Sequence, residues 1–309
     1  MKSVPFDYVR PKTLESACSY LSKDPNSLVL AGGQSLLPML SMRLARPSIL
    51  VDIAHIKELK IIENKRERIK IGSMVRQADA LKNPVIKKYL PLLIKGLNNV
   101  GHPPTRARGT IGGSIAQADP SSEIALVAVT LGAVIKVHST IENVEFLASE
   151  FFLGPMMTAI PDSGCIFEIN FPKPTARKFG TGFNETAPRK SDYALASASA
   201  YVGCKDTGEI DNIKLGIGGV GDFPQLIDLL YRSKLLTQDC ELTLSEFEQE
   251  KIINNKHSIK IKSENELIIK YDIIRAIKHF FGLQNSLDKF KIKLPIYIDQ
   301  IYSKNKFYL

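Results

Sequence analysis

Two pairs of adjacent glycines, Gly32-Gly33 and Gly112-Gly113, constrain this 309-residue chain more than any other feature. Each pair follows apolar residues and is followed closely by a hydroxyl side chain, Ser35 or Ser114. Adjacent glycines let successive backbone N–H groups point the same way, and they let a ligand approach without an intervening Cβ atom. Such backbone nests hold phosphate oxygens. The two pairs together therefore predict a clasp for the two phosphates of a dinucleotide.

The sequence around these glycines argues against the two commonest phosphate-binding folds. Neither pair fits GxGxxG, the dinucleotide fingerprint of Rossmann domains, or GxxxxGK[ST], the P-loop of Walker-type ATPases. The second pair lies in the segment 101–114, where glycine and proline recur throughout. Since both residues interrupt regular structure, this segment is predicted to be irregular.

The composition is that of an ordinary globular protein with two domains or subdomains, because 44% of the residues are hydrophobic and 24% are charged. The formal net charge of +9 suggests an acidic or phosphorylated partner. The basic residues are dispersed, however, and they are not interleaved with aromatic residues. This pattern argues against nucleic-acid binding.

The four cysteines lie far apart, at positions 18, 165, 204 and 240, and no two form a CxxC pair. This spacing argues against a zinc site or an iron–sulfur cluster held by this chain, so no metal ligand is predicted. No signal peptide is evident, and no apolar run reaches the roughly 20 residues that span a bilayer. The expected location is the cytoplasm, with reduced thiols and no membrane span.

Hydrophobic periodicity and capping residues predict the order of the helices and strands. Helices are expected at 14–21 after Thr13, at 75–81, at 84–98 and at 124–131 after Ser121 or Ser122. Strands are expected at 28–30, 49–53, 61–71 (as a hairpin), 133–137, 166–171, 194–201 and 213–217. The segment 172–174 is the predicted domain boundary. Near the end, a capping box at 263–266 predicts one more helix, and residues 289–309 alternate apolar with polar.

Four segments resemble one known family. Residues 31–40, with 43–47 behind them, resemble the first flavin-binding motif of molybdenum hydroxylase FAD subunits, and residues 110–123 resemble the second. The opening 6–11 and the later 189–194 are also similar to that family. It comprises the medium, flavoprotein subunits of the xanthine dehydrogenase and carbon monoxide dehydrogenase group. The resemblance covers roughly residues 1–225.

The resemblance implies an α+β fold of the vanillyl-alcohol-oxidase type, also called PCMH-type. Residues 1–173 would form the FAD-binding domain, with two α+β subdomains at about 1–55 and 56–173. Residues 174–285 would form a smaller C-terminal α+β domain like that of carbon monoxide dehydrogenase. Residues 286–309 would be a tail, and this tail is a candidate interface arm.

The resemblance also implies which residues bind FAD. The backbone of both glycine segments would hold the pyrophosphate, with the hydroxyls of Ser35 and Thr110 donating to its oxygens. Glu123 would accept hydrogen bonds from the ribityl chain, with Asp119 nearby, and Tyr193 would screen the isoalloxazine. Read from the residues alone, the less favoured alternative is that Glu123 is a plain first-turn carboxylate on a helix dipole. The full implied set is Leu30, Ala31, Gly32, Gly33, Gln34, Ser35, Leu36, Val100, Thr110, Ile111, Gly112, Gly113, Ser114, Asp119, Glu123, Ile166 and Tyr193.

Val100 and Ile166 fall where the family packs apolar side chains against the flavin rings, although both are equally good core residues. No residue of the chain is expected to be catalytic, because the redox chemistry belongs to the flavin. FAD would be bound non-covalently. Two alternatives stay open on the sequence: a stand-alone flavin oxidase of the same fold, and a non-enzymatic phosphate- or nucleic-acid-binding module.

The family resemblance further implies partner chains. Electrons would come from a large molybdenum-cofactor subunit, pass through a small subunit with two [2Fe–2S] clusters, and leave through FAD to an external acceptor. The complex would be a dimer of heterotrimers. The substrate of such a complex is oxidised on the molybdenum subunit and not on this chain.

Overall fold

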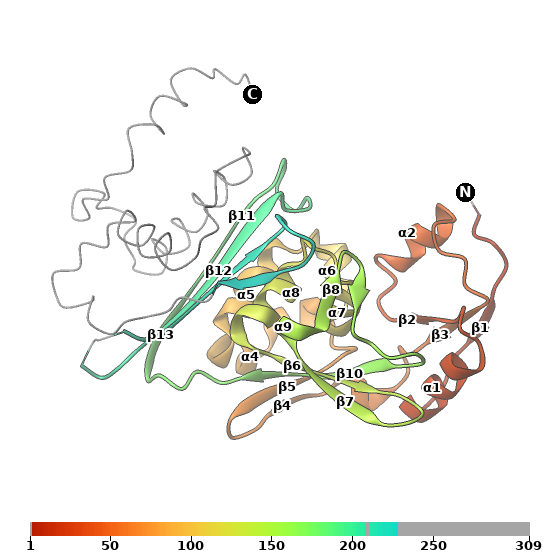
Figure 1. The fold of residues 1–309 in the computed structure, drawn as a ribbon, viewed down its shortest axis with the longest axis horizontal. Helices are drawn as coiled ribbons and strands as arrows, with labels where there is room; N and C mark the ends of the chain where they lie inside the picture. Colours follow the sequence, from red (N-terminus) through yellow and green to blue (C-terminus); the bar gives the residue numbers. More distant parts are fainter. Residues whose placement is uncertain (1, 208–209, 228–309) are drawn as a thin grey trace, which may run out of the picture.

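The computed structural model describes residues 2–207 and 210–227, and its sheets follow one another along the chain (Figure 1). The first lobe holds a three-stranded parallel sheet in the order β1-β3-β2. Its elements are β1 (Asp7–Val9), α1 (Leu14–Lys23), β2 (Leu28–Leu30), α2 (Leu36–Ser41) and β3 (Ile49–Asp52). Thr13 caps α1 as predicted, because its hydroxyl accepts a hydrogen bond from the Ser16 amide at 3.2 Å.

The middle of the molecule is a five-stranded antiparallel sheet with helices on one face (Figure 1). The sheet order is β4-β5-β10-β6-β7, and a short helix η1 (Lys57–Lys60) precedes it. The strands are β4 (Ile62–Asn64), β5 (Arg68–Gly72), β6 (Val134–His138), β7 (Asn143–Leu147) and β10 (Cys165–Pro172). The helices are α3 (Gln77–Lys82), α4 (Pro84–Tyr89), α5 (Pro91–Asn99), α6 (Pro103–Arg108), α7 (Ile111–Gln117), α8 (Glu123–Leu131) and α9 (Ala148–Phe151). A two-stranded ribbon, β8 (Phe152–Gly154) with β9 (Met157–Thr158), follows α9.

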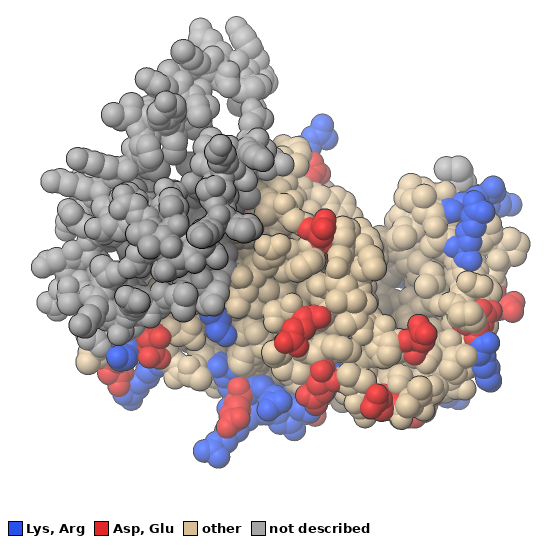
Figure 2. Space-filling view, viewed as in Figure 1, with Lys and Arg blue, Asp and Glu red and all other residues tan. Residues whose placement is uncertain are grey.

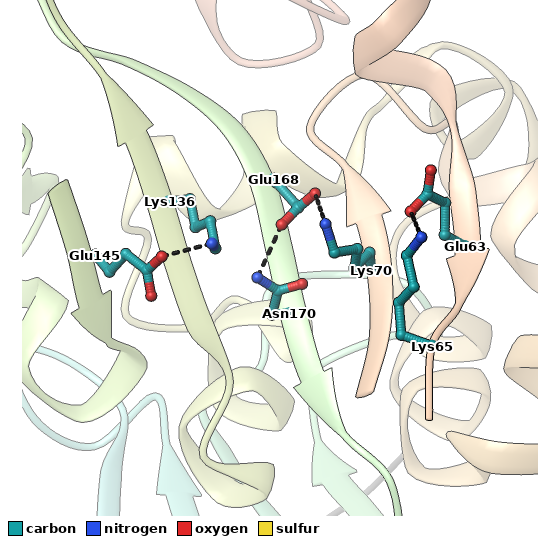
Figure 3. Close-up of polar contacts among 7 residues, drawn as sticks. All are labelled: Glu63, Lys65, Lys70, Lys136, Glu145, Glu168 and Asn170. Atoms are coloured by element: carbon teal, nitrogen blue, oxygen red, sulfur yellow. Dashed lines mark hydrogen bonds and ion pairs between the residues drawn. The ribbon is translucent and has the colours of Figure 1, made fainter. Parts of the chain in front are cut away.

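The face of this sheet that points away from the helices carries a row of charged side chains (Figure 3). Lys136 pairs with Glu145 at 2.5 Å, and Lys70 pairs with Glu168 at 3.1 Å. Glu168 also accepts a hydrogen bond from the Asn170 amide group at 2.9 Å. Alternate residues of β10, such as Ile169, are buried in the core. This alternation gives β10 one core face and one polar face.

Two predictions about the middle of the chain are wrong. The segment 101–114 is not irregular, because it forms α6 and the start of α7. Proline in the first helical turn lacks an N–H group that the helix would leave unpaired, so Pro103 begins α6 without loss. The helix predicted over 84–98 is two helices, α4 and α5, separated at Leu90, the residue before Pro91.

The third sheet is antiparallel, in the order β11-β12-β13-β14, and it packs against α8 and α5. Its strands are β11 (Lys178–Thr186), β12 (Ala196–Cys204), β13 (Ile210–Gly218) and β14 (Gln225–Ile227). The approach to α8 is close: a Cβ atom at Gly216 would lie 2.1 Å from the Thr130 hydroxyl oxygen. Ser199 and Thr130 also share a short hydrogen bond. Every residue of α8 after Glu123 is buried, because this helix packs against the middle layer and against the third sheet.

The predicted boundary at 172–174 falls between β10 and β11, where the chain passes from the second sheet to the third. The division into 1–173, 174–285 and 286–309 stays a prediction. The capping-box helix at 263–266 and the tail from 286 lie outside the described residues. Within the described ranges, no helix is long and apolar enough to cross a membrane. Nor does that part of the chain bring together three or more His, Cys, Asp or Glu side chains as a metal site would require.

Candidate functional site

The two glycine pairs, 80 positions apart in the sequence, meet in the structure. A Cβ atom at Gly32 would lie 2.5 Å from the carbonyl oxygen of Arg108 and 3.0 Å from the Cα atom of Gly109. A Cβ atom at Gly113 would lie 3.6 Å from that of Ala31. The first pair therefore packs against the residues that lead into the second. Only glycine fits at position 32, because the opposing atoms belong to the backbone.

The first pair connects β2 to α2, and its amide groups are available to a ligand. Gly33 has a φ of +73°, in the left-handed region that glycine adopts readily. Among the described residues, no atom accepts a hydrogen bond from the amide nitrogens of residues 32–36. Gly32 and Gly33 are buried, whereas Gln34 and Ser35 are exposed. A run of consecutive unpaired donors at the start of a helix is suited to an anion.

The second pair differs from the first, because most of its amide groups are already paired inside the chain. The Ile111 amide donates to the Val75 carbonyl at 3.0 Å, and the Gly112 amide donates to the Ser73 carbonyl at 2.9 Å. Thr110 caps α7, and its hydroxyl oxygen accepts from the Gly113 amide at 3.0 Å. A Cβ atom at Gly112 would lie 2.4 Å from that of Ser73, so Gly112 lets α7 pack closely on the sheet. The two pairs are not equivalent clasps.

The surface is hollowed where the N-terminal lobe meets the middle layer. In Figure 1 the α2 end of the lobe stands apart from α7 and β8, and Figure 2 shows an open groove between the two parts. The side chains bordering this groove in that view are mostly uncharged. The connection between β2 and α2, which carries the first glycine pair, belongs to the lobe on one side of this groove (Figure 1).

Two arginines that the sequence analysis did not assign to the site lie beside the first glycine pair. The Arg76 guanidinium donates to the Arg108 carbonyl, the same oxygen that faces Gly32. Partial burial and the Arg108 charge lower the pKa of Arg76, and the nearby Asp79 and Asp52 oppose this change. Arg108 itself is exposed. For Arg108 the signal in the sequence is its position directly before Gly109, whereas nothing in the sequence marks Arg76.

Asp119, Glu123 and Tyr193 form a second group of predicted site residues. Burial is the main cause that raises the pKa of Glu123 to about 8, and the Glu185 and Asp119 charges add to it. The pKa of Tyr193 is raised by partial desolvation and by the Asp119 and Glu123 charges, which places the three side chains near one another. The Tyr193 side chain is nevertheless 75% exposed. It therefore stands over the surface and is not a core residue.

The Tyr193 segment and the third sheet are attached to the second glycine segment through two hydrogen bonds. The Ser121 hydroxyl donates to the Ala194 carbonyl at 2.9 Å, and the Gly219 amide donates to the Pro120 carbonyl at 2.9 Å. The third sheet is thereby tied to the loop that carries Asp119. The Asp119 carboxylate in turn accepts a hydrogen bond from the Ser121 amide at 2.9 Å.

The remaining predicted residues are placed by other contacts. Leu30 ends β2, and Leu36 begins α2. The Val100 carbonyl accepts a hydrogen bond from the Arg106 guanidinium at 2.7 Å, and Ile166 lies in the core at 5% exposure. The Ser114 hydroxyl bonds to that of Ser122 at 2.8 Å, and Ser122 caps α8 as predicted.

Comparison with known proteins now identifies the family. Residues 4–174 match the model of the FAD binding domain in molybdopterin dehydrogenase, which is more than half of the chain. The chain belongs to this family.

Two curated relatives extend the similarity. One is the nicotine 6-hydroxylase medium subunit of Paenarthrobacter nicotinovorans, 34% identical over 245 residues, which cover 78% of this chain and 85% of the relative. Another is the glyceraldehyde dehydrogenase medium chain of Sulfolobus acidocaldarius, 36% identical over 219 residues, which cover 71% of this chain and 77% of the relative. The chain is thus a flavoprotein subunit of an oxidoreductase.

Solved structures share the fold of this FAD-binding family. A chain of the carbon monoxide dehydrogenase from Hydrogenophaga pseudoflava matches with a TM-score of 0.79 and 25% identity, covering 91% of this chain and 99% of that chain. A chain of quinoline 2-oxidoreductase from Pseudomonas putida 86 matches with a TM-score of 0.77 and 28% identity, again covering 91% and 99%. The α+β architecture expected from the sequence is confirmed.

Proposed function

We propose that this chain is the FAD-binding subunit of a three-chain molybdenum hydroxylase and passes electrons to an external acceptor. The electrons would come from a small partner subunit with two [2Fe–2S] clusters. That small subunit would receive them from a large molybdenum-cofactor subunit. The observation that carries the proposal is the contact of Gly32 with the Arg108–Gly109 backbone beside unpaired amides. The medium-chain names of the relatives support the assignment to a complex.

The residues at the groove fit FAD. Neutral N–H donors of residues 32–36 suit phosphate oxygens, and glycine at position 32 lets this segment pack directly on the Arg108–Gly109 backbone. These amides would hold the pyrophosphate of FAD. The Ser35 and Thr110 hydroxyls would add donors, because the Thr110 oxygen accepts from Gly113 and leaves its own hydrogen free to donate. FAD, when bound, supplies the redox chemistry of this subunit.

The chain's own residues bind and orient the flavin. Arg76 and Arg108 stand beside the first glycine pair and would offset the pyrophosphate charge, a role that the amides alone do not fill. Glu123 and Asp119 would meet the ribityl hydroxyls. Because its pKa is near 8, the Glu123 carboxyl is mostly protonated at neutral pH and can both donate and accept a hydrogen bond. The exposed Tyr193 would shield the rings from water.

Val100 and Ile166 would line the ring end of the site, and no covalent bond to the flavin is proposed. We also propose that two heterotrimers associate into a dimer. The non-covalent attachment and the dimer extend the family resemblance to this chain, and both are open to direct measurement. Mass spectrometry of the intact complex would give its stoichiometry. Release of the flavin by acid would separate non-covalent from covalent attachment.

A visible absorption spectrum of the purified chain, before and after addition of FAD and removal of free flavin, tests the proposal. We expect retained flavin bands that dithionite bleaches. A folded chain that retains no flavin, either alone or with its copurified partner chains, would contradict the proposal. Steep salt-dependent binding to DNA or RNA without flavin bands would favour the phosphate-binding module instead. Turnover of an organic substrate by the isolated chain would favour the stand-alone oxidase.

A further inference from the structure

A cavity of about 130 Å³ lies at the seam between the middle layer and the third sheet, away from the glycine pairs. Its walls come from the corner between α4 and α5, from the connection 172–175 and from the third sheet. Thr181, Tyr201 and Lys214 line it, and they form one row across β11, β12 and β13, because Tyr201 pairs with both of the others. The seam thus presents a row of polar groups to a partly open cavity.

Two lysines line this cavity from different elements. Lys214 is half-buried on β13, and burial lowers its pKa. Its ammonium donates to the Leu131 carbonyl at 3.1 Å, which uses one of its three hydrogens. Lys173 lies on the connection between the second and third sheets, with its ammonium 4.6 Å from the centre of the Tyr89 ring, another wall of the cavity.

Neither ammonium group has an anionic partner in the part of the chain that the structure describes. The ion pairs found there involve other residues, and none brings a carboxylate within 4 Å of Lys173 or Lys214. Positive charge withdrawn from water is stabilised by an opposite charge or by several hydrogen bonds, and one carbonyl oxygen supplies only part of this. Asn212 and Thr175 add hydrogen-bonding side chains to the same walls.

We propose that this cavity binds a small oxyanion of the phosphate type, held by the ammonium groups of Lys214 and Lys173. The cavity has room for a group of this size, and the Thr181–Tyr201–Lys214 row supplies hydrogen-bonding groups on one wall. Bound there, the anion bridges the FAD-binding layer and the third sheet and stabilises their seam. The site does not depend on the flavin assignment, because it shares no residue with the glycine pairs.

Calorimetric titration of the full chain with inorganic phosphate at constant ionic strength tests the inference. Excess FAD is present, so that phosphate binding at the glycine pairs is suppressed. We expect saturable binding at one site, and Lys214→Gln and Lys173→Gln each weaken it by about tenfold, the loss of one charge-assisted hydrogen bond. A parallel titration with methyl phosphate distinguishes free phosphate from the phosphate group of a larger molecule.

Lys95→Gln is the matched control. Lys95 is also half-buried, and its ammonium donates to the Thr181 carbonyl across the same seam, but it does not line the cavity. We expect this variant to bind phosphate as the unaltered chain does. Absence of saturable binding by the unaltered chain, or equal affinity in all three variants, would overturn the proposal. Should Lys214→Gln fail to fold, the comparison of Lys173→Gln with Lys95→Gln decides, since Lys173 lies outside the secondary structure. A chain that takes no FAD but shows this pattern would contradict the proposed function alone.

Discussion

Gly32 and Arg108 lie so close together that a Cβ atom at Gly32 would approach the Arg108 carbonyl oxygen to 2.5 Å. The same oxygen accepts a hydrogen bond from the Arg76 guanidinium. This contact joins the N-terminal lobe to the middle layer at the edge of the groove. The geometry of the proposed pyrophosphate site therefore depends on how closely the two parts pack.

Gly32→Ala is expected to destabilise the chain by about 1–3 kcal/mol, because the new methyl group must push two backbone segments apart. It should also reduce FAD retention, measured as the ratio of flavin to protein absorbance after gel filtration. Gly154→Ala is the control, since a Cβ atom there would only touch the Met157 sulfur at 3.6 Å. Equal flavin retention in the two variants would contradict the packing argument.

Thr110→Ala should lower the free energy of unfolding by about 1 kcal/mol, because the Gly113 amide loses the hydroxyl oxygen that caps α7. Urea titration followed by circular dichroism measures this change. Thr110→Ser keeps the oxygen and should restore most of the stability. If serine behaves like alanine, then the γ-methyl group of Thr110 and not its cap stabilises the site.

Glu123 makes the stability depend on pH. Its pKa rises from 4.5 to about 8 on folding, so between these values the folded chain binds more protons than the unfolded chain. The free energy of unfolding then falls as the pH rises through this window, by on the order of 2 kcal/mol after allowance for the solvent around a half-buried carboxyl.

Glu123→Gln should flatten this slope, so that the variant matches the unaltered FAD-free chain near pH 4.5 and exceeds it in stability near pH 8. Thermal midpoints across this pH range measure the effect. Glu58→Gln, at an exposed position in η1, is the control and should keep the slope of the unaltered chain. If the stability of Glu123→Gln changed with pH as steeply as that of the unaltered chain, the Glu123 carboxyl would titrate alike in the folded and unfolded states.

Cys18 and Cys165 are expected to resist alkylation in the folded chain. Burial raises the pKa of Cys18 to about 11 and that of Cys165 to about 12, so at pH 8 only about one Cys18 thiol in a thousand and one Cys165 thiol in ten thousand is the reactive thiolate. Iodoacetamide labelling followed by peptide mass spectrometry should modify both only in denaturant. The half-buried Cys204 should react faster and serves as an internal reference. Rapid native labelling of Cys18 would show that the seam between α1 and β10 opens.

The sequence predicts well those elements that are fixed by local chemistry. Thr13 and Ser122 cap their helices, and the hairpin predicted at 61–71 forms as β4 and β5. Each of these depends on residues within a few positions of one another. The boundary residues shift by only a few positions.

Elements that depend on distant neighbours could not be predicted in this way. β11 contains two glycines and no apolar run, and it is a strand because it pairs along its whole length with β12. Position 112 of α7 is glycine because Ser73, nearly 40 residues earlier, occupies the space that a Cβ atom at Gly112 would need. Arg76 reaches the site through its hydrogen bond to the Arg108 carbonyl, and no spacing in the sequence predicts this contact.

The position of α8 limits how members of this family can be recombined. All its residues after Glu123 are buried, and Thr130 meets Gly216 and Ser199 of the third sheet on one side while Val127 meets Gly96 of α5 on the other. A chimaera that joins the first 174 residues of this chain to the C-terminal part of a relative would confront α8 with foreign side chains. A stable chimaera must therefore take α8 and the third sheet from the same parent. Otherwise it must keep the small residues, such as Gly216 and Ser199, that let α8 pack closely on that sheet.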